Sequence, residues 1–195
     1  YKISHMNQLA HDASIPVNER VERAMRKFGR LSTSEIVTPS WVADMMVGYL
    51  PTDKIKKGMK ILDIAAKQGE FAVALCKAYG DKVRNSIYSL PTSSLTYEFT
   101  RKVYALLGLP ISHVIADFNT YDLLNDKEKD ILMSSLKQMN IGLVLGNPPY
   151  QDNAVGEQKT YNGPLYNLFL DKAYEMSGIV EMIHPARFLT NAGST

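Results

Sequence analysis

The chain alternates short apolar runs with segments of helical periodicity, and this alternation constrains its fold more than any other feature. The apolar runs predict buried strands over residues 60–65, 85–90, 111–116, 141–145 and 179–183. Helical patterns occupy residues 70–79, 96–107, 125–139 and 165–176. Strands separated by helices join through right-handed crossovers, which produce a mostly parallel sheet. We therefore expect an α/β fold with helices on both faces of the sheet.

Polar residues stand at or just past the ends of three expected strands. These residues are Asp63, Asp117 and Asn147. In open parallel sheets, ligands bind outside the carboxyl ends of the strands. The positions of these three side chains therefore predict a functional site at that edge of the sheet.

Asn147-Pro148-Pro149-Tyr150 directly follows the apolar run 141–146. The prolines cannot donate to a β-ladder and fix their own backbone angles, which leaves the Pro148 carbonyl free to accept a hydrogen bond. The Asn147 side chain offers a second acceptor, and the Tyr150 ring offers a flat face. Two acceptors beside one ring suit a planar substrate that carries an amino group, such as adenine. The simpler alternative is a rigid proline turn with a packed tyrosine.

Several stretches together resemble the motifs of S-adenosylmethionine-dependent methyltransferases that act on planar amino groups. Residues 147–150 resemble motif IV of these enzymes, and Thr38-Pro39 resembles motif X. Thr38 is also the expected N-cap of a helix over residues 40–50. Residues 62–71 are similar to motif I, Asp117-Phe118 to motif III and residues 183–189 to motif VI. The order X, I, IV is the gamma order of many DNA adenine methyltransferases in restriction–modification systems.

The resemblance implies a Rossmann-like methyltransferase fold whose C-terminal strands are missing from this chain. It implies methyl transfer from S-adenosylmethionine to the exocyclic amino group of an adenine flipped out of duplex DNA. The catalytic residues would be Asn147, Pro148, Pro149 and Tyr150. The cofactor-binding residues would be Thr38, Pro39, Asp63, Ala65, Gly69, Phe71, Asp117 and Phe118.

The chain departs from the family pattern in motif I and after the second strand. Ile64, Ala66 and Lys67 replace the usual Pro, Cys and first Gly, so Lys67 is expected to point away from the cofactor or to reshape the loop. Pro91 stands where an acid usually binds the ribose, and the hydroxyl of Thr92 or Ser93 is a candidate substitute. These departures leave open a degenerate, non-catalytic module that binds DNA or a protein partner. Two further alternatives stay open, an RNA-base methyltransferase and a protein-glutamine methyltransferase, because enzymes of both kinds share the tetrapeptide.

The expected organisation is an N-terminal helical or linker segment over residues 1–32 and an incomplete methyltransferase catalytic domain over residues 33–195. The parent chain is expected to be longer and to carry other domains. Residues 19–28 predict a helix with a basic face. That face is either solvated or in contact with DNA phosphates.

Composition adds a few limits. The net charge is only +2, which neither supports nor excludes a nucleic-acid partner. A single cysteine, Cys76, cannot form an internal disulfide, which favours a cytoplasmic protein. No apolar run is long enough for a membrane span. The four histidines lack the spacing of metal ligands, so we expect no metal site.

Overall fold

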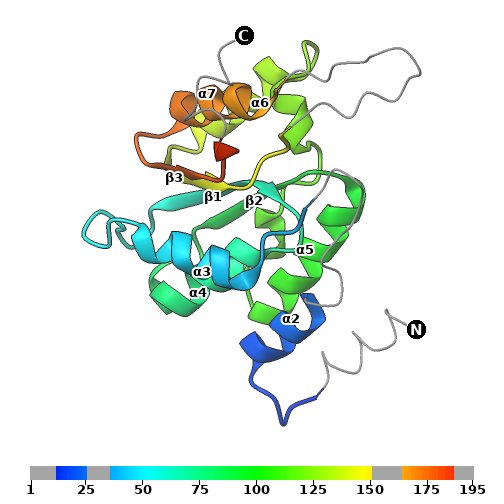
Figure 1. Cartoon of the computed structure of the whole chain (residues 1–195), viewed down its shortest axis with the longest axis vertical. Helices are drawn as coiled ribbons and strands as arrows, with labels where there is room; N and C mark the ends of the chain where they lie inside the picture. Colours follow the sequence, from blue (N-terminus) through cyan, green and yellow to red (C-terminus); the bar gives the residue numbers. More distant parts are fainter. Residues whose placement is uncertain (1–11, 26–35, 151–163, 187–195) are drawn as a thin grey trace.

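The computed structural model describes residues 12–25, 36–150 and 164–186. Within these ranges the chain forms a four-stranded parallel sheet at the centre of the molecule (Figure 1). The strand order is β2-β1-β3-β4. The strands are β1 (Lys60–Ala66), β2 (Ile87–Pro91), β3 (Ile141–Gly146) and β4 (Val180–Met182). The mostly parallel α/β sheet predicted from the sequence is therefore confirmed.

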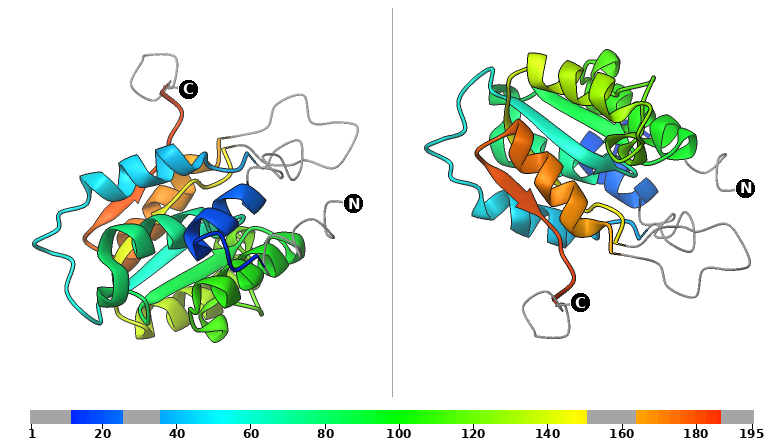
Figure 2. Two further views of the ribbon diagram at one scale, coloured as in Figure 1. Left: turned by 90° about the horizontal axis from the view of Figure 1, so that it is seen from below. Right: turned by 90° about the horizontal axis from the view of Figure 1, so that it is seen from above.

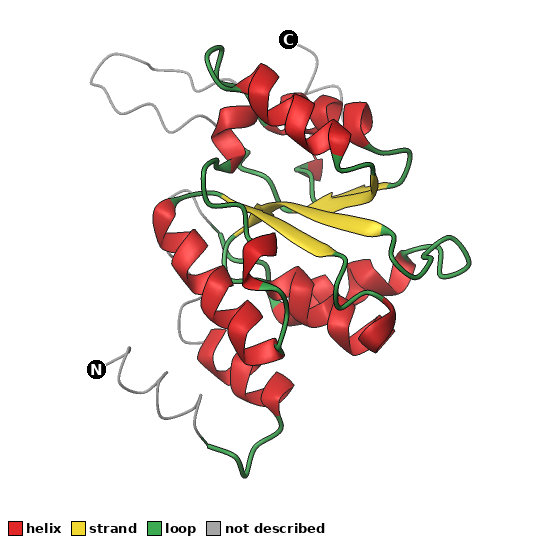
Figure 3. Cartoon of the chain, turned by 180° about the vertical axis from the view of Figure 1, so that it is seen from behind, coloured by secondary structure: helices red, strands yellow, loops and turns green. Residues whose placement is uncertain are grey.

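Helices cover both faces of this sheet (Figures 1 and 3). One layer contains α2 (Val17–Met25), α3 (Ser40–Tyr49), α4 (Glu70–Tyr79) and α5 (Ser94–Leu107). The opposite layer contains α6 (Lys129–Gln138) and α7 (Tyr166–Met176). The two views of Figure 2 show α6 and α7 over one face of the sheet and α3 beside α4 on the other.

Each face of the sheet has its own hydrophobic core, because successive side chains of a strand point to opposite faces. Ile61 of β1 and Leu143 of β3 pack with residues of α3, α4 and α5, including Phe71 and Tyr104. Leu62, Ile64 and Val144 pack on the other face with residues of α6 and α7, including Leu132, Leu136, Phe169 and Ala173. Every residue of β1 after Lys60 is buried, as expected for a central strand with helices on both sides.

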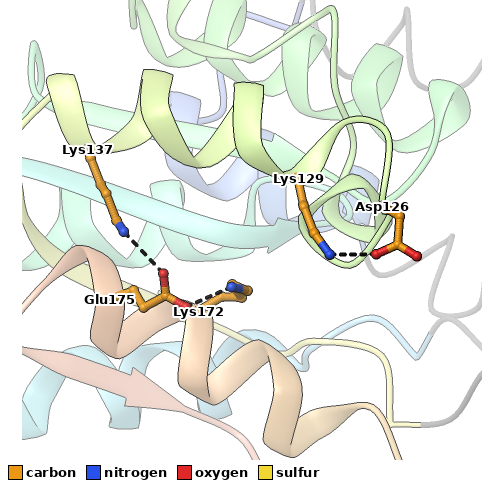
Figure 4. Close-up of polar contacts among 5 residues, drawn as sticks. All are labelled: Asp126, Lys129, Lys137, Lys172 and Glu175. Atoms are coloured by element: carbon orange, nitrogen blue, oxygen red, sulfur yellow. Dashed lines mark hydrogen bonds and ion pairs between the residues drawn. The ribbon is translucent and has the colours of Figure 1, made fainter.

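Ion pairs at the surface link the two helices of the smaller layer (Figure 4). Lys137 of α6 lies 3.1 Å from Glu175 of α7, and Lys172 donates to the same carboxylate at 2.7 Å. These groups are partly exposed to solvent, so each pair contributes about 1 kcal/mol or less. The position of α6 and α7 therefore depends mainly on the apolar side chains beneath them.

Two predicted elements differ from the structure. The strand predicted over residues 111–116 is wrong: residues 111–113 form a 3₁₀ turn, and only Val114 makes an isolated bridge, to Ser89. The carbonyls of Pro110 and Ile111 accept hydrogen bonds from His113 and Val114, so these groups are used locally instead of in a ladder. The helix predicted from Asn125 begins only at Lys129, after a turn.

The predicted N-terminal helix is present as α2, which ends at Met25 in the described part of the chain. Val21 is buried against α4 and α5, and Glu22 pairs with Lys77 of α4. Arg23 pairs with Glu19 of its own helix, while Arg26, Lys27 and Arg30 lie outside the described residues. No helix within residues 12–25, 36–150 and 164–186 has the length and apolar character needed to cross a membrane.

Candidate active site

The tetrapeptide Asn147–Tyr150 begins directly after β3, at the carboxyl edge of the sheet. The preceding residue, Gly146, has a φ of 155°, and a Cβ atom there would lie 3.0 Å from Cγ2 of Ile64. Only glycine meets both conditions without strain. Both prolines are buried and Tyr150 is half-buried, and the Tyr150 carbonyl accepts a hydrogen bond from the N–H of Leu165 at 3.1 Å. The backbone is therefore fixed on both sides of the tetrapeptide.

The side chain of Asn147 is held by two neighbours. It is only 7% exposed. The Tyr150 hydroxyl donates to Oδ1 of Asn147 at 2.9 Å, and Nδ2 of Asn147 donates to Oγ1 of Thr38 at 3.3 Å. Thr38 and Asn147 are far apart in the sequence, so the fold itself brings the predicted motif X and motif IV together.

Thr38 does not cap α3, contrary to the prediction from the sequence. The cap residue is Pro39, whose carbonyl accepts hydrogen bonds from Val42 and Ala43. The buried Thr38 contacts the site instead: its N–H donates to Oε1 of Glu70 at 3.1 Å while its hydroxyl accepts from Asn147. Thr38 thus links the first turn of α4 to the tetrapeptide.

Glu70 is a buried carboxylate that the sequence analysis did not single out. Its Oε1 accepts from Thr38, and its Oε2 accepts from the N–H of Gln68 at 2.8 Å. It occupies the first turn of α4, where the helix dipole favours a negative charge. An acid directly after the loop glycine Gly69 was the available sequence signal for this role.

Asp63 is fully buried in β1, and its carboxyl group is strongly perturbed. Oδ1 accepts a hydrogen bond from the N–H of Ala65 at 3.2 Å, whereas Oδ2 has no hydrogen-bond partner among the described residues. Burial raises the pKa of Asp63 well above its usual range, and the negative charge of Glu70 raises it further. The Ala65 N–H and the positive charge of Lys67 oppose this shift. The carboxyl group therefore lies in an environment that would favour an added positive charge.

Lys67 turns into the protein rather than into solvent. It is 3% exposed, and its Nζ donates to the backbone carbonyl of Asn147 at 2.6 Å. The Lys67 side chain thus connects the loop after β1 to the backbone of the tetrapeptide. Gly69 keeps its left-handed conformation, with a φ of 78°, at the N-cap of α4.

Asp117 and Phe118 line a second part of the site, beyond the end of β2. They border a cavity of about 220 Å³ together with Pro91, Ser93, Ser94, Tyr97, Ala116 and Asn119. The hydroxyl groups of Thr92 and Ser93, the candidates for ribose binding, both contact Oγ1 of Thr96 at 3.3 Å. They are thus already engaged at the start of α5.

Thr120 connects the strand ends beside this cavity and was missed by the sequence analysis. Its buried hydroxyl donates to the carbonyl of Ile64 at 2.9 Å and lies 3.2–3.3 Å from those of Pro91 and Leu90. A single threonine carries no distinctive sequence signal for such a contact. It ties the ends of β1 and β2 to the segment that carries Asp117 and Phe118.

The remaining predicted cofactor residues differ in their surroundings. Phe71 is buried in the core shared with α3 and α5, and Ala65 is buried in the core on the opposite face of the sheet. Pro39 is exposed at the start of α3. Among the described residues, no group of three or more His, Cys, Asp or Glu side chains has an arrangement that could hold a metal ion.

Solved structures with the same fold include a subunit of a restriction–modification system and a protein in complex with DNA. One is the crystal structure of a type I restriction–modification methyltransferase subunit from Streptococcus thermophilus, with 21% identity and a TM-score of 0.61 over 90% of this chain. Another is the complex of DrdV with DNA, with 18% identity and a TM-score of 0.56 over 90% of this chain.

A third solved structure, from Listeria monocytogenes, is assigned to the class I S-adenosylmethionine-dependent methyltransferases; it shows 12% identity and a TM-score of 0.55 over 92% of this chain. The chain covers 41%, 23% and 59% of these three proteins respectively, less than two thirds of each. At these identities the three similarities establish the fold.

Curated proteins provide no significant match to the sequence. The sequence profile of the Eco57I restriction-modification methylases, however, matches residues 61–195, which include β1, the loop with Lys67 and the tetrapeptide. The chain therefore belongs to the Eco57I restriction-modification methylase family.

Proposed function

We propose that this chain forms the centre that transfers a methyl group from S-adenosylmethionine to the exocyclic amino group of adenine in DNA, as part of a restriction–modification system. The observation that carries the proposal is the Asn147 side chain, held by Thr38 and Tyr150 at the carboxyl edge of the sheet. Membership in a restriction-modification methylase family supports the reaction class. The similarity to a methyltransferase subunit and to a protein solved with DNA agrees with a DNA substrate.

The residues around the ends of β1 and β2 fit S-adenosylmethionine. The unpartnered Oδ2 of Asp63 would gain from a positive charge, and this cofactor carries a sulfonium and an ammonium group. The cavity beside Asp117 and Phe118 offers an acceptor and an aromatic ring to a flat base. The residues that would hold the cofactor or shape its site are Thr38, Pro39, Asp63, Ala65, Gly69, Phe71, Asp117 and Phe118. When bound, the cofactor supplies a methyl group on a positively charged sulfur.

The tetrapeptide would bind and orient the amino group of the base. That nitrogen is a poor nucleophile because its lone pair is delocalised into the ring. Oδ1 of Asn147 and the Pro148 carbonyl would accept hydrogen bonds from its two N–H groups, which favours a pyramidal nitrogen with its lone pair directed at the methyl group. An amide oxygen accepts two hydrogen bonds, so Asn147 retains one acceptor site besides the one used by the Tyr150 hydroxyl. The Tyr150 ring would stack on the base.

The proposal has consequences for the rest of the protein. An adenine amine is unreachable inside a duplex, so the base must flip out of the helix into the site. Residues 33–195 would form part of the catalytic domain, with residues 1–32 as an N-terminal segment. Sequence recognition would reside in other domains of a longer parent chain. With DNA as substrate, the protein would act in the cytoplasm.

Three features of the site favour a second candidate, a module that has lost activity. Lys67 replaces a loop glycine, and Pro91 stands in place of the ribose-binding acid. In addition, the hydroxyls of Thr92 and Ser93 are engaged with Thr96. These features would weaken cofactor binding, and a module that binds DNA without methylating it would be the result. An RNA base or a protein glutamine is a further possible methyl acceptor, because the same tetrapeptide occurs in enzymes for those substrates.

The test is transfer of labelled methyl groups by the full-length protein to duplex DNA, RNA and protein, with Asn147→Ala as the variant. We expect methylated adenine in DNA only, and a loss of about a hundredfold or more in the single-turnover rate for Asn147→Ala. Asn125→Ala, at an exposed turn, is the matched control and should retain the wild-type rate. Binding of DNA by the folded protein, without detectable cofactor binding or methyl transfer, would favour the inactive module. A wild-type rate for Asn147→Ala would show that the tetrapeptide is only a rigid turn.

A further inference from the structure

The side chain of Lys67 occupies a buried position that a charged group rarely takes without a defined partner. Lys67 belongs to the loop between β1 and α4, the same loop that would contact the cofactor. A glycine at this position could not make the contact that Lys67 makes with the backbone of the tetrapeptide. Burying an ammonium group is costly unless it is hydrogen-bonded and near a negative charge. Lys67 makes such a hydrogen bond, and its charge interacts with the carboxyl group of Asp63.

The hydrogen-bond partner of Lys67 is the backbone of Asn147. Nζ of Lys67 donates to the Asn147 carbonyl at 2.6 Å, a short contact with a charged donor. The positive charge of Lys67 also lowers the pKa of Asp63, against the larger upward effect of burial. The ammonium group thus connects the loop after β1 to the start of the tetrapeptide.

Holding this carbonyl fixes more than one atom. It belongs to the peptide group between Asn147 and Pro148, and the proline ring fixes φ of the following residue. On the other side stands Gly146, with a φ of 155° and the freedom of a residue without a side chain. A rotation of the 147–148 peptide group would displace both proposed acceptors, Oδ1 of Asn147 and the Pro148 carbonyl. Thr38 and Tyr150 hold only the side-chain end of Asn147.

We propose that Lys67 is a positioning residue for methyl transfer: its ammonium group anchors the Asn147–Pro148 peptide, so that the two amino-group acceptors face the base in a fixed geometry. The inference rests on the proposed function and deepens it. It assigns a role in orienting the acceptors to Lys67, the residue that departs from the family's glycine pattern.

The test compares Lys67→Met with Lys67→Arg in the full-length protein. Methionine keeps a long apolar side chain without a donor, whereas arginine keeps a charged donor. We expect Lys67→Met to lower the single-turnover rate by about a hundredfold, as a small misplacement of reacting groups does. Cofactor affinity by calorimetry and KM for DNA should stay within about threefold of wild type. Lys67→Arg should recover most of the rate, and Lys57→Met, at an exposed position, is the control for loss of a lysine.

A second measurement does not depend on activity. Amide hydrogen exchange over residues 141–150 should become faster in Lys67→Met but not in Lys67→Arg or Lys57→Met. If Lys67→Met does not fold, Lys67→Leu, which also lacks a donor, takes its place, and a rate equal to that of Lys67→Arg would contradict the proposal.

Three results would overturn the inference. One is a wild-type rate in Lys67→Met, another is unchanged exchange, and the third is a loss confined to cofactor affinity. A wild-type protein that methylates nothing refutes the proposed function instead, and the exchange experiment still decides whether Lys67 anchors the peptide.

Discussion

Replacing Glu70 by alanine should destabilise the protein, because two buried backbone N–H groups would lose their acceptor. The carboxylate accepts from Thr38 at 3.1 Å and from Gln68 at 2.8 Å. Water cannot replace the carboxylate without a free-energy cost, because both the glutamate and its partners are buried. Glu70→Gln is the matched variant: it keeps one amide oxygen but presents an NH₂ group to the second donor.

The magnitude follows from these two contacts. Hydrogen bonds to a charged group contribute about 1.5–3 kcal/mol each. Removing Glu70 also relieves its repulsion with Asp63, whose pKa it raises, and this relief offsets the loss of stability by on the order of 1 kcal/mol. We therefore expect Glu70→Ala to lower the free energy of unfolding by about 2–5 kcal/mol. A loss of ~3 kcal/mol corresponds to a decrease of roughly 6–12 °C in melting temperature for a domain of this size. Glu70→Gln should lose about half as much.

Calorimetry of the cofactor-free protein measures the global effect, and hydrogen exchange at the Thr38 and Gln68 amides measures the local one. Both amides should exchange faster in Glu70→Ala, while the strand amides of β2 should change only in proportion to global stability. A free energy of unfolding within ~0.5 kcal/mol of wild type, together with unchanged exchange at the two amides, would refute the role assigned to Glu70.

Two further predictions concern the tetrapeptide and pH. Tyr150→Phe removes the hydroxyl that holds Asn147 and should slow single-turnover methylation about fivefold, the equivalent of ~1 kcal/mol. Tyr150→Ala also removes base stacking worth roughly 1–3 kcal/mol and should be far slower. Equal losses of rate in the two variants would contradict the stacking role. Burial raises the pKa of Asp63 in the folded state, so the folded protein binds this proton more tightly than the unfolded chain does. The free energy of unfolding should therefore fall as the pH rises from the unfolded-state pKa, about 3.9, through the raised folded-state value. Asp63→Asn should therefore gain stability over wild type with increasing pH in urea titrations without cofactor, and a pH-independent difference would show that the carboxyl group is not perturbed.

The regular elements were predictable from the sequence because their signals are local. The helix over residues 70–79 has the predicted bounds, with Gly80 at its end, since apolar periodicity and a terminal glycine are both short-range features. The strand predicted over residues 111–116 does not form. The proline before that stretch leads into a 3₁₀ turn with local hydrogen bonds, and only an isolated bridge at Val114 remains.

The positions of site residues that directly follow a strand were predictable from the sequence, whereas contacts between residues far apart in the sequence were not. Asn147 directly follows β3 at the carboxyl edge of the sheet, as predicted, whereas Asp63 lies inside β1, three residues before its end. Thr38 has the sequence of a helix cap, yet its partners are Glu70 and Asn147, which no local pattern connects to it. The inward direction of Lys67 likewise depends on a carbonyl that only the folded sheet brings near.

The position of β1 at the centre of the sheet has a consequence for the nascent chain. β1 pairs with β2, which follows soon after it, but its other edge pairs with β3 at residues 141–146. At typical synthesis rates the ribosome needs roughly 4–15 s to go from the end of β1 to the start of β3. During that time an apolar strand keeps one row of unpaired backbone groups open to other chains. Asn147 leaves the ribosome directly after β3, so the step that protects this edge also brings the tetrapeptide to Thr38, Asp63 and Lys67.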